Sequence, residues 1–185
     1  MLKKKTFGYI ERDEEARQEF EEKISKINPD DLIYMDETSI DDTEAYQFGW
    51  GKKGERLFGM KKGAKSDRLS IISALSQKSL CASLLFTGSC DRNVFETYVE
   101  KVLVPVLTPG KTIVLDNATF HHGGKIQKLI KDAECELLYL PSYSPDLNPI
   151  EHFWAPLKNK IRQLLPQFSN NLCEAALQAF AFAGI

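Results

Sequence analysis

The sequence predicts an α/β fold built on a five-stranded mixed sheet with helices on its faces. Three observations support this prediction: short apolar runs typical of buried strands, helical segments between the later runs, and two strand-like runs in direct succession. Strands that alternate with helices pair in parallel, whereas two successive strands joined by a short turn pair antiparallel. A sheet with both features is mixed.

The first 36 residues predict a helix followed by a buried strand. One face of the helix, over residues 10–27, is apolar and consists of Ala16, Phe20, Ile24 and Ile27. Asn28-Pro29-Asp30 provides its end. The apolar run 32–35 then predicts a buried strand that ends at Asp36.

The middle of the chain contains the predicted antiparallel pair. Residues 41–67 are polar, Gly-rich and basic, and indicate a loop or an irregular hairpin. The runs 69–75 and 81–86 then predict two strands joined by a turn. Asp91 is an N-cap residue type, and apolar residues follow it at helical spacing until Pro109-Gly110.

The second half of the chain alternates strands with helices. Strands are predicted over 112–115 and 136–140, with a helix over about 124–131 between them. Two further helices complete the predicted fold, one starting at Asn148-Pro149 and one over about 171–183. This order of elements describes a ribonuclease-H-like arrangement.

The composition is typical of a soluble protein with one domain of ordinary size. The 185 residues include 43% hydrophobic and 27% charged residues, and the formal net charge is -2. Because there is no overall basic excess, contact with nucleic acid must come from a local patch. No apolar run approaches the roughly 20 residues that cross a bilayer, and no signal peptide is evident. We therefore expect a soluble, cytoplasmic protein without a membrane partner.

Cysteines and histidines do not predict a zinc site. No Cys-x-x-Cys pair occurs among the four cysteines, which are Cys81, Cys90, Cys135 and Cys173. His121 and His122 lack a third histidine at zinc-site spacing. The scattered cysteines, which lie among apolar residues, indicate small hydrophobic side chains in a reducing compartment.

Two aspartates follow the ends of apolar runs in the predicted sheet. Asp36 follows the run 32–35 and Asp116 follows the run 112–115. Ligand sites in α/β sheets gather at the carboxyl ends of strands, so neighbouring strands would place both carboxylates side by side. Adjacent carboxylates repel each other, and a divalent cation such as Mg²⁺ relieves that repulsion. The alternative, which is commoner for an aspartate at a strand end, is a turn former or a helix cap.

Glu151 also has two competing interpretations. If Asn148 caps the last long helix and Pro149 is its first residue, Glu151 completes a capping box. A carboxylate folded back on the helix start cannot also point at a metal. The surrounding sequence favours the metal role.

Three sequence blocks contain these carboxylates: Tyr34-Met35-Asp36-Glu37-Thr38, Leu115-Asp116-Asn117-Ala118 and Tyr143-Ser144-Pro145-Asp146-Leu147-Asn148-Pro149-Ile150-Glu151. They resemble the three catalytic blocks of the Tc/mariner superfamily of DDE transposases, and most of all its bacterial insertion-sequence branch. The 34 residues between Asp116 and Glu151 are similar in number to the spacing in that branch. The resemblance covers about residues 30–165, and the string from Ser144 to Glu151 is its most specific part.

The resemblance implies a ribonuclease-H-like fold in which Asp36, Asp116 and Glu151 are the metal ligands and the catalytic residues. It implies two Mg²⁺ ions, which Mn²⁺ can replace. It also implies cleavage of DNA at transposon ends, strand transfer into target DNA, and a homodimer. Only one short acidic helix precedes the resembling region, so we expect an upstream helix-turn-helix polypeptide or fusion, or else that the chain is a fragment. The expected location is the bacterial cytoplasm, at the nucleoid when the protein is on DNA.

The resemblance also suggests how the chain is divided. We predict a linker helix over 1–29, a catalytic domain over 30–165 with a basic insertion over 41–67, and a C-terminal helix of the same domain over 166–185.

Two groups of neighbouring residues are candidates for supporting roles. Candidate DNA contacts in the basic segment are Trp50, Lys52, Lys53, Arg56, Lys61, Lys62, Lys65 and Arg68. A solvated charged face or a dimer contact would account for the same segment. Candidates for hydrogen bonds that support the ligands are Asn117, Asn148 and His152. Turn chemistry for the asparagines, and a surface or packing position for the histidine, are the alternatives.

Two other functions remain compatible with the sequence. One is a nuclease of the same fold that acts on a different substrate, such as an RNA–DNA hybrid. The other is an inactive remnant that binds DNA or a transposase partner. The intact set of three carboxylates argues against the remnant.

Overall fold

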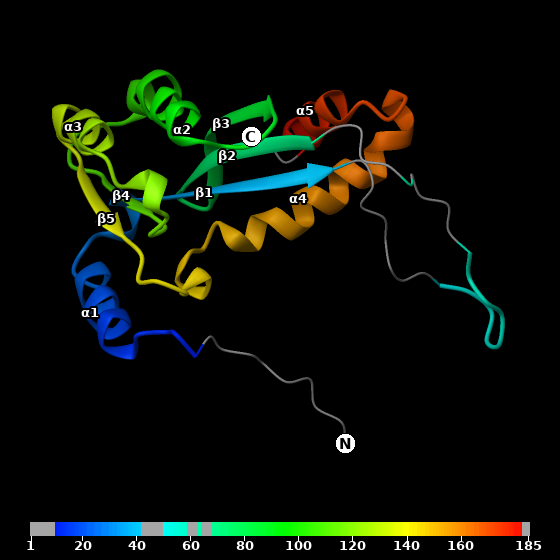
Figure 1. Cartoon of the computed structure of the whole chain (residues 1–185), viewed down its shortest axis with the longest axis horizontal. Coiled ribbons are helices and arrows are strands. Elements are labelled where there is room, and N and C mark those ends of the chain that lie inside the picture. The colour runs from blue at the N-terminus through cyan, green and yellow to red at the C-terminus, as the bar shows by residue number, and fades with distance from the viewer. Residues whose placement is uncertain (1–9, 42–49, 59–62, 64–67, 183–185) are drawn as a thin grey trace.

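A five-stranded sheet with the strand order β3-β2-β1-β4-β5 lies at the centre of the chain (Figure 1). The computed structural model describes residues 10–41, 50–58, 63 and 68–182. The strands are β1 (Leu32–Asp41), β2 (Arg68–Ser76), β3 (Ser79–Thr87), β4 (Thr112–Leu115) and β5 (Glu136–Tyr139). The pairs β1–β2 and β2–β3 are antiparallel, whereas β1–β4 and β4–β5 are parallel. The predicted mixed sheet with a hairpin at one edge is therefore present.

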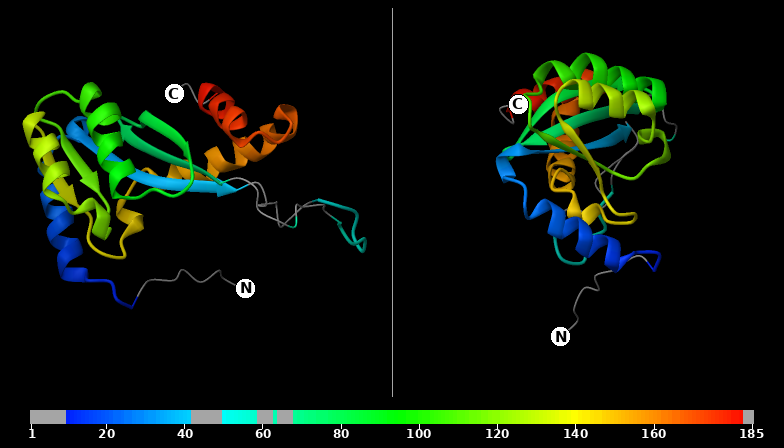
Figure 2. Two further views of the ribbon diagram at one scale, coloured as in Figure 1. Left: turned by 45° about the horizontal axis from the view of Figure 1, so that its top comes forward. Right: turned by 90° about the vertical axis from the view of Figure 1, so that its left-hand side faces the viewer.

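Helices cover both faces of this sheet (Figure 2). They are α1 (Glu14–Ile24), α2 (Arg92–Tyr98), α3 (Gly124–Asp132), α4 (Glu151–Leu164) and α5 (Leu172–Phe182). One face of the sheet packs against α4 and α5, and the opposite face packs against α2 and α3. No helix in the described part of the chain has the length and apolar character needed to span a membrane.

The alternation of side chains along the strands separates the two cores. Ile40 of β1 belongs to the same core cluster as Trp154 and Leu157 on the α4 side. Met35 of the same strand contacts the α2 side, which includes Phe95. Successive residues of a strand point to opposite faces, so even-numbered residues of β1 face α4 and odd-numbered residues face α2.

The predicted end of the first strand is wrong. β1 continues through Asp36 to Asp41 because β2 pairs with it along nearly its whole length, from Ile33 opposite Ser76 to Asp41 opposite Arg68. β4 pairs in parallel only with residues 32–34 of β1. Asp36 therefore lies inside a strand, at the point where the neighbouring strand β4 has ended.

The predicted helix after Asp91 changes its hydrogen-bonding pattern along its length. The Asp91 side chain accepts a hydrogen bond from the backbone N–H of Val94, so the predicted cap is present. After α2 the path continues as a π turn over Val99–Leu103 and a 3-10 turn over Val104–Val106. Pro105 has no backbone N–H, so a regular α-helix is not maintained through this position.

Helix α4 begins at Glu151 and not at Asn148-Pro149 as predicted. Its N-cap residue Ile150 makes no side-chain hydrogen bond, so the capping box that was the alternative role of Glu151 does not form. The Asn148 side chain instead reaches β1, where Nδ2 donates to the backbone oxygen of Met35 at 3.3 Å. This hydrogen bond links the segment that precedes α4 to the central strand β1.

Helix α1 packs beside β4 and β5. Phe20 is 5% exposed and lies in an apolar cluster with Leu32, Val114 and Leu140. This cluster is on the α4 side of the sheet, because Leu32 is an even-numbered residue of β1. The helix therefore closes one end of the core, while the predicted boundary at residue 29 stays a prediction.

Candidate active site

The strand register brings Asp36 and Asp116 level with each other. In the parallel pair β1–β4, Tyr34 lies opposite Val114. Asp36 and Asp116 each come two residues later, Asp36 inside β1 and Asp116 just beyond the end of β4. Because β1 and β4 are neighbours, as predicted, the two aspartates come to the same part of the sheet.

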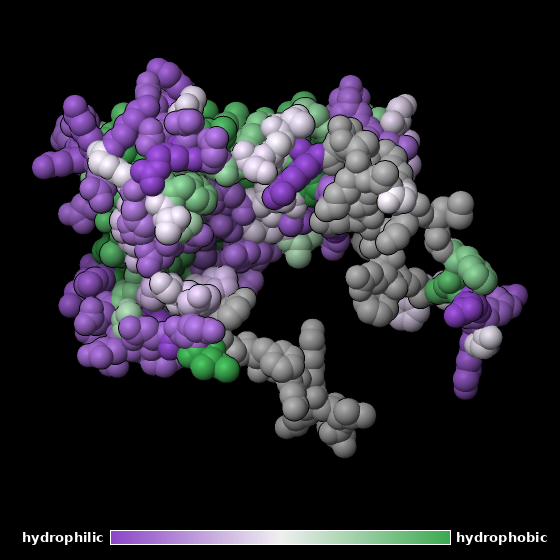
Figure 3. Space-filling model, in the orientation of Figure 1, coloured by the Kyte–Doolittle hydropathy of each residue, from purple (hydrophilic) through white to green (hydrophobic). Residues whose placement is uncertain are grey.

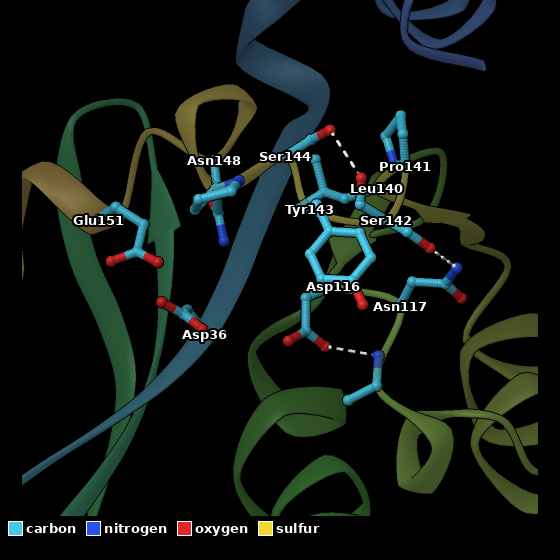
Figure 4. A pocket seen from close by; sticks show the side chains of 12 residues that line it. Asp36, Asp116, Asn117, Leu140, Pro141, Ser142, Tyr143, Ser144, Asn148 and Glu151 are labelled. Carbon is cyan, nitrogen blue, oxygen red and sulfur yellow. Dashed lines mark hydrogen bonds between the residues drawn. The ribbon is translucent and has the colours of Figure 1, made fainter. Parts of the chain in front are cut away.

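Segments from four parts of the chain surround a pocket of about 380 Å³ beside these two aspartates. Its walls are β1, the segment after β4, the loop from Leu140 to Asn148, and the first turn of α4. Asp36, Asp116 and Glu151 all line it, and Figure 4 shows Glu151 and Asp36 close to each other with Asp116 across the pocket. The fold thus brings the three predicted ligands to one cavity.

Asp36 is held by a hydrogen bond from α4. The indole Nε1 of Trp154 donates to Asp36 Oδ2 at 2.7 Å. Burial raises the pKa of Asp36 to about 7, because the Trp154 hydrogen bond, which lowers it, is outweighed by burial together with the nearby charges of Glu151 and Glu37. Such a carboxylate is unfavourable as a bare anion and is stabilised by a cation.

Asp116 has a different environment because His121 contacts it. His121 Nδ1 lies 2.5 Å from Asp116 Oδ1, and the backbone N–H of Ala118 donates to the same oxygen at 3.1 Å. Burial acts to raise the pKa of Asp116, but hydrogen bonding and positive charge from His121 outweigh it and lower that pKa. Asp116 is therefore ionised at neutral pH.

His121 lies between two carboxylates. Its other ring nitrogen, Nε2, is 2.8 Å from Glu37 Oε1. Burial by itself would lower the pKa of His121, yet the two flanking carboxylates raise it to about 9. Protonated His121 offsets one of the negative charges gathered here.

Glu151 stands at the first residue of α4, where its side chain projects into the pocket (Figure 4). Partial burial raises the pKa of Glu151, and Asp116 adds to the rise, whereas Lys158 and His152 oppose it. The three predicted ligands therefore influence one another electrostatically, since Glu151 also raises the pKa of Asp36.

The donor set suits a hard divalent cation. Carboxylate oxygens are the ligands that Mg²⁺ prefers, and a cation among like charges offsets their repulsion. The buried Asn148 Oδ1, which has no hydrogen-bond partner among the described residues, belongs to a residue that lines the same pocket and adds an acceptor for a ligand or its water. Within the described residues, no group of three or more His, Cys, Asp or Glu side chains already has the spacing of a metal site.

The three candidate supporting residues occupy different positions. Asn117 lines the pocket, donates from Nδ2 to Ser142 Oγ at 3.1 Å, and accepts through Oδ1 from His122 Nε2 at 2.5 Å. Asn148 is buried and bonded to β1, as described above. His152 is exposed and does not line the pocket. Supporting roles for all three remain predictions.

Comparison with known protein families shows to which family the chain belongs. A sequence model of the family described as DDE superfamily endonuclease matches residues 31–173, which is most of the chain. The chain belongs to the DDE superfamily endonucleases. All three pocket carboxylates lie within the matched region.

Curated relatives of this DDE endonuclease are transposases. The Tcb1 transposase of Caenorhabditis briggsae is 35% identical over 79 residues, which are 40% of this chain and 29% of that protein. The Tc1 transposase of Caenorhabditis elegans is 33% identical over 69 residues, which are 37% of this chain and 25% of that protein. The matches thus span less than a third of these relatives, and they confirm the resemblance to the Tc/mariner superfamily.

Solved structures confirm the fold. The Mos1 transposase paired-end complex with left transposon end superposes with a TM-score of 0.70 at 12% identity, over 98% of this chain and 62% of that chain. The catalytic domain of Mos1 mariner transposase superposes with a TM-score of 0.53 at 12% identity, over 90% of this chain and 86% of that one. The predicted ribonuclease-H-like fold is therefore correct.

Those predicted DNA-contacting residues of this DDE endonuclease that the structure describes do not line the pocket. Trp50, Lys52, Lys53 and Arg56 are exposed in the segment 50–58, which extends beyond the sheet and helices (Figure 1). In the space-filling view this segment shows hydrophobic and hydrophilic atoms side by side (Figure 3). Arg68 begins β2, and its Nη2 donates to Ser39 Oγ at 3.1 Å. Lys61, Lys62 and Lys65 lie outside the described residues, so DNA contact by this segment stays a prediction.

Sequence patterns alone missed three side chains of the site, namely Trp154, His121 and Glu37. Trp154 fits the apolar face of α4, so its spacing predicts packing and not a hydrogen bond to Asp36. His121 follows Asp116 by five residues, and its sequence context raises only the question of a zinc site. A signal was available for Glu37, because a charged residue next to Asp36 in a buried strand needs a partner on the opposite face.

Proposed function

We propose that this chain is the catalytic part of a transposase that cuts and joins DNA in a divalent-metal-dependent reaction. One observation carries the proposal: Asp36, Asp116 and Glu151 come from three separate segments of the chain and line one pocket. The family supplies the chemical class, since it is a family of endonucleases. The transposase relatives supply the biological context.

The proposed ligands are the carboxylates of Asp36, Asp116 and Glu151, and the proposed metal is Mg²⁺, with Mn²⁺ able to replace it. Solved Mos1 complexes are described with Mn and with Mg, which supports this choice. Two bound ions would supply activation of the attacking water or 3′-hydroxyl and stabilisation of the leaving oxygen. The chain itself orients the ligands: Trp154 holds one oxygen of Asp36, and Ala118 with His121 holds one oxygen of Asp116.

The proposed substrates are transposon ends and target DNA, because structural neighbours are described as paired-end and strand-transfer complexes. The basic segment around Lys52 and Lys53 would contact phosphates without reading bases. A homodimer, and an upstream helix-turn-helix polypeptide or fusion that recognises the ends, complete the proposal. We place the protein in the bacterial cytoplasm, at the nucleoid when it is bound to DNA.

Metal-dependent nicking of supercoiled plasmid tests this proposal. Asp116→Asn keeps the size of the side chain but removes the charge that a cation needs, so nicking in Mg²⁺ or Mn²⁺ should fall by more than about 100-fold. The matched control is Asp132→Asn on the exposed end of α3, which should nick like the unaltered chain. Circular dichroism verifies that both variants fold.

Undiminished nicking by Asp116→Asn would refute the assignment of the ligands. The same assay on an RNA–DNA hybrid distinguishes the transposase from a nuclease of the same fold. Preferential cleavage of the hybrid would favour the nuclease. Strand transfer into a second DNA would favour the transposase.

A further inference from the structure

We propose that His121 is a positioning residue that, braced by Glu37, fixes the orientation of the Asp116 carboxylate for metal binding. This inference rests on the proposed function, because it assigns a role in the same site. Neither the family match nor the motif around Asp116 distinguishes His121 from its neighbour His122. The geometry does distinguish them.

The His121 ring is locked in place by aromatic packing. His121 lies in a 3-10 turn over Thr119–His121 and is 1% exposed. Its ring centroid lies 4.1 Å from that of Phe95 on α2 and 4.2 Å from that of Phe120. Because aromatic rings flank it, the imidazole is not free to rotate, and its two nitrogens keep fixed directions.

Both fixed nitrogens face carboxylates. Nδ1 lies 2.5 Å from Asp116 Oδ1, and Nε2 lies 2.8 Å from Glu37 Oε1. Ionised carboxylates only accept hydrogen bonds, so the ring donates on both sides. The Glu37 side chain is only 16% exposed, so the hydrogen bond between Glu37 and His121 is partly shielded from water. A charge-assisted hydrogen bond in such surroundings is strong.

The contact with His121 determines which carboxylate oxygen of Asp116 is available to bind a cation. The backbone N–H of Ala118 donates to Oδ1, the same oxygen that faces His121. Two directed contacts on one oxygen fix the rotation of the carboxylate about its bond to Cβ. The other oxygen lies on the side of the pocket that holds Asp36 (Figure 4). The ligand oxygen is therefore presented before a cation arrives, which reduces the entropy lost on binding.

Glu37 can support His121 because of its position in β1. Asp36 and Glu37 are adjacent and point to opposite faces of the sheet. Asp36 meets Trp154 on the α4 side, whereas Glu37 meets His121 on the α2 side. Glu37 thereby links β1 to the segment after β4, and one strand supplies both a proposed ligand and the brace for another.

Two amide substitutions separate the two contacts of His121. In His121→Asn the amide nitrogen can occupy the place of Nδ1, so a donor to Asp116 is kept and the contact to Glu37 is lost. In His121→Gln the amide nitrogen can occupy the place of Nε2, so the contact to Glu37 is kept and the donor to Asp116 is lost. Both variants replace the ring by an amide, so a general loss of packing affects them alike.

The measurement is Mn²⁺ binding to the full chain by titration calorimetry, together with thermal unfolding and plasmid nicking. We expect His121→Gln to bind Mn²⁺ on the order of 10- to 100-fold more weakly than the unaltered chain, as is typical when a hydrogen bond to a metal ligand is removed. His121→Asn should stay within about threefold of the unaltered chain, because its donor to Asp116 remains. Tyr98→Phe is a control for burial, since its hydroxyl is buried without a hydrogen-bond partner among the described residues, and it should bind Mn²⁺ normally.

Three outcomes would overturn the inference. Unchanged affinity in both amide variants would show that Asp116 needs no such support. Equal losses of affinity in the two variants, matched by equal losses of thermal stability, would show that His121 acts only through packing. Absence of Mn²⁺ binding by the unaltered chain would overturn the metal assignment itself, and the positioning role with it. Failure of the proposed function is thus distinguishable from failure of the positioning role, because the first is seen in the unaltered chain and the second only in the His121 variants.

Discussion

At the scale of single residues, the site depends on aromatic donors as much as on carboxylates. Trp154 is 5% exposed and packs in the core between the sheet and α5, yet its indole N–H donates to Asp36 Oδ2 at 2.7 Å. A buried Trp N–H needs an acceptor, and a buried carboxylate needs a donor, so each group satisfies the other. The hydrogen bond leaves the Asp36 carboxylate with a defined orientation in the pocket.

Trp154→Phe should raise the pKa of Asp36 above its value of about 7, because the substitution removes the hydrogen bond that lowers it while burial continues to raise it. A carbon-detected NMR titration of the aspartate carboxyl groups in the metal-free chain would measure this shift. Trp50→Phe is the matched control, because Trp50 is fully exposed and distant from the pocket. A pKa for Asp36 that does not rise in Trp154→Phe would show that the indole does not stabilise the anion.

The sequence could nominate the three carboxylates because each lies in a contiguous block of residues. It could not assign Trp154 or His121, because their roles depend on contacts between distant segments. Trp154 pairs with a residue 118 positions away, and His121 pairs with one 84 positions away. Periodicity explains Trp154 equally well as a core residue, so nothing local distinguishes its second role.

At the scale of elements, helix α1 is fastened to the loop that forms one wall of the pocket. Arg17 is buried and donates to both oxygens of Asp146, at 3.1 Å from Nη1 and 2.8 Å from Nη2. Arg12 adds a contact to Asp146 Oδ2 at 3.1 Å. Asp146 belongs to the short 3-10 turn Pro145–Leu147, which leads to Asn148 and α4. The N-terminal helix therefore supports the segment that positions Glu151.

Asp146→Asn should lower the free energy of unfolding by about 1 to 2 kcal/mol at neutral pH, the size expected for a partly exposed, charge-assisted pair. Burial acts to raise the pKa of Asp146, but Arg17 and Arg12 outweigh it and lower that pKa. The stabilisation is thus present above the ordinary carboxyl pKa of about 3.9 and is lost as pH falls through the lower pKa of the folded state. Denaturant unfolding from pH 7 to pH 2 should show the variant and the unaltered chain converging in acid, and a constant difference would contradict this account.

The elements themselves were predictable to different degrees. The apolar runs that became β2, β4 and β5 are short and continuous, so their positions follow from the sequence. β1 was predicted too short because residues 36–39 are polar, and only the pairing with β2 keeps them in a strand. The start of α4 cannot be predicted from the sequence because Asn148 is a residue type that commonly caps helices, whereas its side chain here donates a hydrogen bond to the backbone oxygen of Met35 in β1.

At the scale of the whole molecule, acidic and basic residues are concentrated in different elements. The formal net charge is only -2, but α1 is acidic and the segment 50–58 is basic. That segment also exposes Trp50, Leu57 and Phe58. Exposed aromatic and basic side chains together suit a surface that binds phosphates and stacks on bases.

Lys52→Glu combined with Lys53→Glu should weaken binding to DNA and flatten its salt dependence, since each lost phosphate contact reduces the slope of log K against log salt by about 0.9. The matched control is Lys128→Glu combined with Lys131→Glu, which makes the same change of charge on exposed positions of α3. Fluorescence anisotropy with a labelled duplex between 50 and 200 mM salt, roughly the range over which such contacts are sensitive, measures both variants. Equal weakening in the two pairs would point to net charge and not to this segment.

The alternation along β1 makes the site intolerant of changes in strand length. Deleting one residue ahead of Asp36 would move Glu37 into the pocket and turn Asp36 toward the aromatic side of the sheet. Inserting one residue there would bring Met35 to the pocket, where it offers no carboxylate. Insertions and deletions are therefore expected in the segments between strands and not within Leu32–Asp36. A shift of one residue in β1 would exchange the face that carries the proposed ligand Asp36 with the face that carries Glu37.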